Sequence, residues 1–346
     1  MKIDDRMKRL GILFLLLVAF LNANAQDPQF SQYYASPLYL NPSFVGTTPY
    51  HRFIFNHRNQ WPSIANGFVT YAFSYDYNLV DQNSGVGLLV TTDKAGSADL
   101  RSTTINLLYA YKLQLADKWV ISPSIYFGYG SRNIDFNKLV FGDQLEFDLD
   151  GNIPTDDPSF GSLGNAGFFD FGAGILIYNK HFWGGISSYH LNQPNQSLLD
   201  GDSRLPVRTS VHAGAQIPIK TGPFSSNRNI SVAPSFVYKR QGNFDQLDLG
   251  LRFLLQPVMI GFWYRGIPIQ QNVNDNISQD AFVLILGMQF EQMEVGYSYD
   301  FTISELGPIS GGAHEISLKY EVDLMLRRKV KRKQKYIPCP TFIKKN

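Results

Sequence analysis

Charged side chains recur in stretches where polar and apolar residues alternate, and these are the residues whose types could do chemistry. They fall in the polar phase of the alternation and carry both signs. Charges inside a low-dielectric wall are costly unless they are paired or wetted. We therefore interpret them as ion pairs that brace an interior, with a pathway for a polar ligand as the alternative. They are Arg52, Arg58, Asp76, Asp170, Arg252, Arg265, Glu294, Asp300 and Glu315.

A hydrolytic site would need a serine, a histidine and an orienting acid or amide within hydrogen-bond reach. His190 and His314 lie on predicted strands or strand ends, but no serine stands at a telling spacing from either. The sequence also lacks a Gly-x-Ser-x-Gly motif. We therefore name no catalytic residue and expect no enzyme activity.

An acidic stretch between residues 131 and 166 has some of the spacing of a calcium loop. In Asp148-Leu149-Asp150-Gly151-Asn152, however, the glycine stands fourth rather than sixth, and no bidentate Glu follows at the right distance. A solvated loop that reaches a partner or folds over a mouth is our interpretation, and calcium binding stays open. We name no metal and no cofactor. The acidic residues are Asp143, Glu146, Asp148, Asp150, Asp156 and Asp157.

The clearest element that positions such residues is a hairpin between residues 293 and 323. Apolar and polar residues alternate strictly on both arms, and a loop rich in Gly, Pro and Ser joins them, which predicts two antiparallel strands. Tyr297, Tyr299 and Tyr320 lie on the apolar face near strand ends, where membrane barrels carry aromatic girdles. The polar face is then a lumen.

The chain is long enough for a single barrel of about fourteen strands, and it contains fourteen segments of this kind, an even number. The predicted fold is all-β, a transmembrane antiparallel up-and-down β-barrel of about 14 strands over residues 50–324. The segments are 51–58, 68–77, 84–93, 101–113, 118–130, 167–179, 181–190, 207–217, 229–239, 245–255, 257–265, 280–290, 293–301 and 313–323.

The connections between these segments alternate in length. Those after even-numbered segments are mostly tight and those after odd-numbered segments are longer, with 218–228 as the exception. Outer-membrane barrels have short periplasmic turns and longer external loops. Both chain ends are therefore predicted to be periplasmic.

Residues 1–25 have the pattern of a secretory signal peptide. Basic residues precede an apolar run at 10–21, and Ala23-Asn24-Ala25 has a small-x-small cleavage signature. The run is too short for a membrane helix. The mature chain is expected to begin at Gln26 and to reside in the outer membrane.

Residues 26–49 are predicted to be a non-strand, plug-like segment at the periplasmic end of the barrel. Pro28, Pro37 and Pro42 interrupt any strand ladder, and several aromatic residues need burial. A disordered leader is the alternative, although disordered segments are poor in aromatic residues.

The tail at 325–346 is strongly basic, while the whole chain has a formal net charge of only +2. The charge balance gives no global field for nucleic acid, so we expect no nucleic-acid partner. A periplasmic tail could contact anionic lipid headgroups or a periplasmic protein. The single cysteine, Cys339, could pair with another chain or remain free.

Five stretches resemble the PorP/SprF family of outer-membrane proteins of Bacteroidetes. They are DPQFSQYYASPLYLNPSFVG, HRNQWP, HLNQP, WYRG, and GYSYDFTISELG followed by HEISL, in this order along the chain. The residues that match the family pattern are Asn41, Pro42, Arg58, Asn59, Gln60, Trp61, His190, Pro194, Trp263, Tyr264, Arg265, Tyr297, Tyr299, Asp300, Ser304, His314 and Glu315.

The resemblance implies a type IX secretion system barrel without enzyme activity. Such a barrel would support secretion or surface anchoring of large proteins that carry a C-terminal sorting domain, such as gliding adhesins. Its expected partners are outer-membrane lipid, that cargo and other components of the system. A porin or small-solute channel is the alternative, because the alternation alone would permit it.

Overall fold

The computed structural model describes residues 26–64, 66–116, 118–135, 138–141, 143–144, 155–156, 164–199, 201–219, 230–271, 277–304, 307–323 and 339. The predicted signal peptide, most of the acidic loop and all of the basic tail except Cys339 lie outside these residues. Within the described part of the chain, no helix is both long enough and apolar enough to cross a lipid bilayer.

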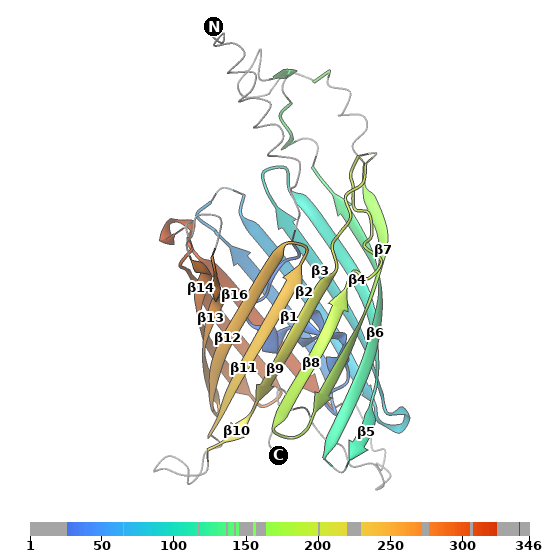
Figure 1. Ribbon diagram of the computed structural model, residues 1–346, viewed down its shortest axis with the longest axis vertical. Coiled ribbons are helices and arrows are strands. Elements are labelled where there is room, and N and C mark those ends of the chain that lie inside the picture. Colours follow the sequence, from blue (N-terminus) through green and yellow to red (C-terminus); the bar gives the residue numbers. More distant parts are fainter. Residues whose placement is uncertain are drawn as a thin grey trace.

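The described strands form one antiparallel sheet that closes on itself (Figure 1). Of its sixteen strands, β5 and β10 are short extensions that pair with β6 and β11, and the other fourteen form the ring. The ring closes because β16 pairs with β1 and β9 pairs with β11. The predicted barrel of about fourteen strands is therefore confirmed.

The strand bounds follow the predicted segments closely. The strands are β1 His51–Gln60, β2 Phe68–Leu79, β3 Ser84–Ala95, β4 Leu100–Tyr111, β5 Leu113–Ala116, β6 Trp119–Asn133, β7 Ala166–Tyr178, β8 Phe182–Tyr189, β9 Arg208–Ala215, β10 Ile217–Pro218, β11 Ile230–Gln241, β12 Phe244–Leu255, β13 Val258–Gln271, β14 Ile277–Phe290, β15 Met293–Thr302 and β16 Ala313–Val322. Short 3-10 turns, η3 Val80–Gln82 and η5 Pro308–Ser310, lie in two of the connections.

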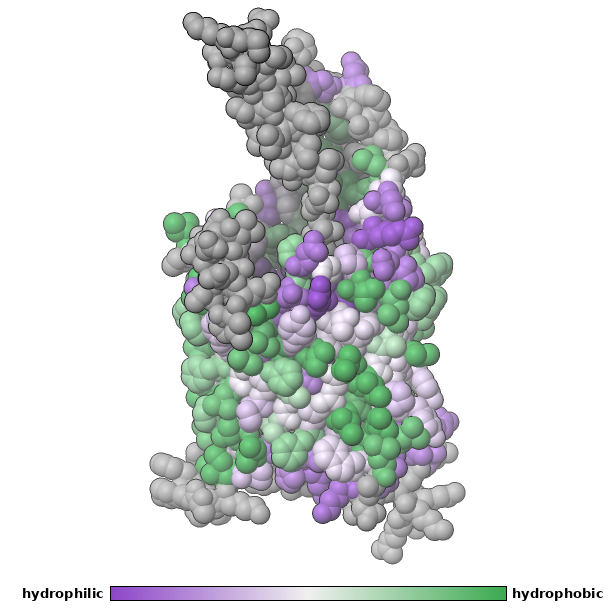
Figure 2. All heavy atoms as spheres, viewed as in Figure 1, coloured by the Kyte–Doolittle hydropathy of each residue, from purple (hydrophilic) through white to green (hydrophobic). Residues whose placement is uncertain are grey.

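Alternation along each strand separates an apolar outer face from a polar inner face. In β6, Ile125, Phe127 and Tyr129 are exposed on the outside, while Ser124 and Tyr126 between them are buried inside. Figure 2 shows the result as apolar side chains over the wall of the barrel, with hydrophilic residues gathered toward its ends. This outer belt is the surface that a bilayer would cover.

The two ends of the barrel differ. The end that carries the start of β1, the end of β16 and the short connections at 179–181, 256–257 and 291–292 is called the turn end here, and it lies at the bottom of Figure 1. At 179–181 the side chain of Asn179 accepts hydrogen bonds from the backbone of His181 and Phe182 at 2.7 and 2.8 Å, which closes the turn. The opposite end, with longer connections, is called the loop end.

Residues 26–49, called the inner segment here, form no strand and lie inside the barrel (Figure 1). They contain three short helical turns, η1 Tyr33–Ala35, α2 Pro37–Leu40 and η2 Pro42–Phe44, and nearly all of their side chains are buried. A proline begins both α2 and η2, where its missing N–H costs nothing. The predicted non-strand character is confirmed. The segment reaches the turn end as expected, and it also extends through the lumen to the loop end.

Candidate functional site

Asp27 holds the first part of the inner segment at the loop end. Its carboxylate accepts hydrogen bonds from Nε2 of His190 at 2.7 Å and from Nη1 of Arg208 at 2.9 Å. Nδ1 of His190 lies 2.8 Å from the carboxylate of Asp170. Burial lowers the pKa of His190, but the charges and hydrogen bonds of Asp27 and Asp170 outweigh it and raise the pKa to about 9. His190 is therefore an imidazolium at neutral pH and donates to a carboxylate on each side.

Arg208 adds two aromatic contacts to this anchor. Its guanidinium lies 4.4 Å from the ring centres of both Tyr39, in the inner segment, and Tyr189, on the wall. The Tyr39 hydroxyl also accepts a hydrogen bond from Arg208 at 2.7 Å. A desolvated cation between two ring faces is stabilised by about 2 kcal/mol or more, so the contact ties α2 of the inner segment to β9.

Ser31 lies at the centre of a buried polar cluster. Its hydroxyl donates to Oδ2 of Asp300 at 2.7 Å and accepts from Arg58 and Arg265, both at 2.8 Å. The same Asp300 oxygen pairs with Arg58 at 2.8 Å and with Arg265 at 2.9 Å. All four side chains are buried. One serine of the inner segment thus joins β1, β13 and β15.

Glu315 binds the backbone of the inner segment beside the Ser31 cluster. Its carboxylate accepts from the backbone N–H of Ser31 at 2.7 Å and of Gln32 at 3.1 Å. The Gln32 amide donates to the backbone carbonyl of Glu315 at 2.9 Å, and its oxygen accepts from Ser317 at 2.7 Å. Arg58, at 3.3 Å, neutralises the charge of Glu315. Since these contacts involve backbone groups, they fix the path of the inner segment as well as its side chains.

Asn41 docks the middle of the inner segment against β7, β8 and β9. Its amide nitrogen lies 3.2 Å from the carbonyl oxygens of both Ile175 and Ile186 and 3.0 Å from Nε2 of His212. Gly185 makes this approach possible, because a Cβ built there would lie 2.7 Å from the Ile175 oxygen and 2.9 Å from the Asn41 nitrogen. A side chain at this position would displace the asparagine.

A bidentate ion pair secures the last part of the inner segment at the turn end. Arg52 meets Asp76 through Nε at 2.7 Å and Nη2 at 3.0 Å, and both side chains are buried. The Asp76 carboxylate also accepts from the backbone N–H of Gly46 at 2.7 Å, while Arg52 donates to the carbonyl of Phe44 at 3.0 Å. Lys112 donates to the Gly46 carbonyl. The pair therefore positions the bend that leads into β1.

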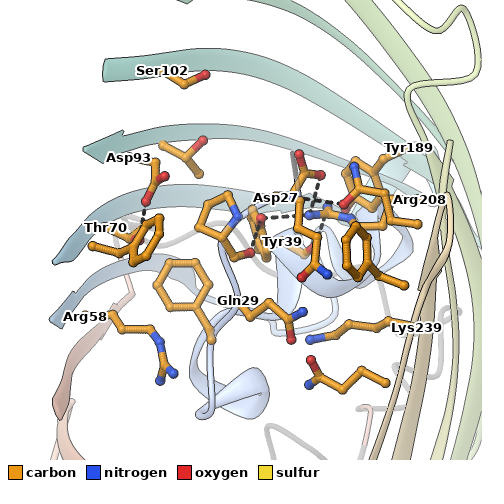
Figure 3. Close-up of a pocket in the computed structure, with 18 of the residues that line it drawn as sticks. Asp27, Gln29, Tyr39, Arg58, Thr70, Asp93, Ser102, Tyr189, Arg208 and Lys239 are labelled. Atoms are coloured by element: carbon orange, nitrogen blue, oxygen red, sulfur yellow. Dashed lines mark hydrogen bonds and ion pairs between the residues drawn. The ribbon is translucent and has the colours of Figure 1, made fainter. Parts of the chain in front are cut away.

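A cavity of about 710 Å³ remains between the inner segment and the loop end. Figure 3 shows side chains from the inner segment and from the surrounding strands turned into it. The lining combines aromatic residues with hydroxyl, amide and charged groups. Its floor includes Asp27, Arg58 and Arg265, which also anchor the inner segment, so the cavity and the anchors form one continuous polar interior.

The residues that match the family pattern fall into three groups. Asn41, Pro42, Arg58, His190, Trp263, Arg265, Asp300 and Glu315 belong to the interior, where Trp263 packs on Tyr33 with ring centres 5.0 Å apart. On the outer face of the barrel lie Tyr264, Tyr297, Tyr299 and His314, which make aromatic contacts there, and the Tyr297 hydroxyl lies 2.9 Å from His314. At the loop end lie Asn59, Gln60, Trp61, Pro194 and Ser304, and there the backbone N–H of Trp61 donates to the Gly312 carbonyl while the Trp61 ring packs on Phe68.

Several residues that hold the inner segment were missed by the sequence analysis. Asp27, Ser31 and Gln32 lie within the first matching stretch but were not singled out. Without a period-two alternation, the sequence does not indicate which side chains of this segment face the barrel wall. Arg208 and His212 do show a signal, since they share with Ser210 the polar, inward phase of β9. Their partners in the inner segment could not be inferred from that alternation.

The arrangement around His190 does not correspond to a hydrolytic triad. In the described part of the chain its ring contacts Asp27 and Asp170, its backbone contacts Tyr126, and no serine hydroxyl bonds to it. Among the described residues, no group of three or more His, Cys, Asp or Glu side chains is placed to hold a metal ion.

Comparison with known proteins identifies a family. The model of the type IX secretion system membrane protein PorP/SprF family matches residues 22–320. No curated protein matches the chain significantly.

Solved structures with some similarity include the P. putida toluene transporter TodX, with 10% identity over 82% of this chain and 92% of that one and a TM-score of 0.44. A Pseudomonas aeruginosa FadL homologue has 11% identity over 83% of this chain and 94% of that one, also with a TM-score of 0.44. Similarity at this level says nothing about what the chain does.

Proposed function

The chain belongs to the PorP/SprF family of type IX secretion system membrane proteins, and from this premise we propose that it is a closed platform in the outer membrane. In this role it supports secretion or surface anchoring of large proteins with a C-terminal sorting domain, such as gliding adhesins, and catalyses no reaction. Its partners are that cargo, outer-membrane lipid and other components of the system.

The observation that carries this proposal is the filled lumen. The inner segment is held at the loop end by Asp27, midway by Ser31 and Asn41, and at the turn end by Gly46. Removing one partner from a buried, charged hydrogen-bond network costs several kcal/mol. A lumen obstructed at several levels suits a protein that presents loops to a partner better than one that passes solutes.

We propose that the family-pattern residues of the interior serve to fix the inner segment, and that those at the loop end shape the surface that meets the partner. The domain limits follow the same logic. Residues 1–25 direct export and are removed near Ala25, residues 26–49 act as the plug, residues 50–324 form the barrel, and residues 325–346 form a basic periplasmic tail.

A small-solute channel is the second candidate, and the cavity at the loop end favours it, since about 710 Å³ is enough for a small organic molecule. In that function the inner segment would have to move aside. The family match and the anchors at successive levels favour the platform.

The test is deletion of the gene, followed by comparison of the surface and secreted proteomes with those of the parent strain and of a strain complemented with the intact gene. The proposal predicts that one or a few large sorting-domain proteins leave the surface and that complementation restores them. An unchanged surface proteome combined with altered uptake of small solutes would overturn it in favour of the channel.

A further inference from the structure

The cavity at the loop end contains a cation to which the described residues supply no acceptor. Lys239, on β11, lines the cavity, and in the part of the chain that the structure describes its ammonium takes part in no hydrogen bond or ion pair. Its side chain reaches from the wall toward the middle of the cavity in Figure 3. An ammonium in such a place needs either water or an anion as its counterpart.

The acids around Lys239 are already engaged by other donors. Arg58, Arg208 and Arg265 act on Lys239 electrostatically, together with the carboxylate of Asp248. Asp248 itself accepts from Nε of Arg265 at 2.9 Å and from the Gln246 amide at 2.8 Å. Three arginines therefore act on Lys239 while the Asp248 carboxylate has other partners, which favours an anion from outside the chain.

A second donor without a partner lies in the same cavity. The side chain of Gln29 lines it, and its amide N–H₂ donates no hydrogen bond to another described residue, while its buried amide oxygen has no partner among them either. Figure 3 shows Gln29 turned toward the side of the cavity from which Lys239 comes. An amide N–H₂ and an ammonium together match the two oxygens of a carboxylate.

The opposite wall would repel an anion. Asp93, on β3, also lines the cavity, and its carboxylate accepts a hydrogen bond from Thr70 at 2.6 Å while forming no ion pair with any cation among the residues that the structure describes. Figure 3 places Asp93 and Lys239 on opposite sides. An anionic group that enters from the loop end is thereby directed to the side of Lys239.

We propose that Lys239 and Gln29 form a carboxylate-binding site in this cavity. The carboxylate belongs either to the end of a polypeptide chain or to a small organic acid, and hydroxyl and amide side chains such as Thr91, Thr104 and Asn106 offer further polar contacts to either one. The site is independent of the proposed role in export, because it rests on the cavity alone.

Calorimetric titration of the full-length barrel in detergent tests the proposal with three probes, namely acetate, an acetylated tetra-alanine with a free C-terminal carboxylate, and the same peptide with a C-terminal amide. The free-acid peptide is expected to bind about tenfold or more tightly than the amide, since one charged contact is worth about that factor. Lys239→Met is expected to abolish this preference, and Lys239→Arg to retain most of it.

Arg132→Met is the matched control, because Arg132 lines the same cavity on another wall, on β6, and its loss removes an equal charge. The preference for the free acid should survive in this variant. Equal binding of acid and amide, no binding of either, or an equal loss in both variants would overturn the proposal.

Competition by acetate at the concentration at which the peptide binds supports a site for small acids, whereas binding of the peptide alone supports a site for a chain end.

Discussion

The hydroxyl of Ser31 donates to Oδ2 of Asp300 at 2.7 Å, although 269 positions separate the two residues in the sequence. This hydroxyl also accepts from Arg58 and Arg265, so the inner segment supplies a neutral group at the centre of three buried hydrogen bonds. The interior of the barrel is organised around a segment that is not part of its wall.

Ser31→Val is expected to destabilise the protein by about 1–3 kcal/mol, because the two guanidinium groups and the carboxylate each lose a buried partner. Chemical unfolding in detergent measures the change. Ser102→Val is the matched control, since Ser102 lines the cavity and its hydroxyl makes no hydrogen bond in the described part of the chain. Equal stability of the Ser31 and Ser102 variants would contradict the account.

Gly185→Ala should loosen the inner segment, whereas Gly184→Ala should not. A Cβ at Gly185 meets the Ile175 oxygen at 2.7 Å and the Asn41 amide at 2.9 Å, while a Cβ at Gly184 finds its nearest neighbour, the Ala213 Cβ, at an ordinary 3.5 Å. Overpacking of this kind costs about 1–3 kcal/mol. Limited proteolysis of the inner segment would report it, and equal protection in both variants would argue against docking through Asn41.

Removing Arg52 alone should cost more than removing its ion pair. Arg52→Met leaves the buried Asp76 carboxylate without its bidentate partner and should cost about 3–5 kcal/mol. The double variant Arg52→Met with Asp76→Asn removes both charges and should recover part of that loss. Thermal unfolding of the three proteins measures the difference, and additive costs would mean that the pair does not act as a unit.

The loop-end anchor should weaken as the pH rises from about 6.5 to about 9. The pKa of His190 is raised from 6.5 to about 9 in the folded protein, so protonated His190 contributes its full stability below pH 6.5 and loses it as the pH rises through 9. The contribution is about 3 kcal/mol at most.

His190→Gln should remove this pH dependence while the ion pair between Arg208 and Asp27 stays in place. Hydrogen exchange of the backbone near Asp27, compared between pH 6 and pH 9, measures the effect. If the wild-type protein and the variant gained exchange equally over that interval, His190 would not be the titrating group.

The barrel could be predicted from the sequence to within a few residues, because each strand carries its own alternation. The hairpin of β15 and β16 shows this, since the predicted limits 293–301 and 313–323 nearly coincide with Met293–Thr302 and Ala313–Val322. The inward orientation of charged residues such as Arg52 and Asp76 could be predicted from the same alternation, and the two residues lie opposite each other on adjacent strands.

The course of the inner segment could not be predicted in the same way. Its helical turns are too short for a periodic signal, and its contacts, such as Ser31 with Asp300 or Asn41 with His212, join residues far apart in the chain. Aromatic and proline content indicated a buried, non-strand segment. Its extension from the turn end to Asp27 at the loop end depends on partners that alternation does not specify.

The single-channel conductance of the purified, full-length protein in planar bilayers tests the central claim most directly, namely that the inner segment closes the lumen. The account predicts no steady ion current across the bilayer, and a rise in current when Ser31→Val and Gly185→Ala are combined in one folded variant. A large, ungated conductance of the wild-type protein would contradict it.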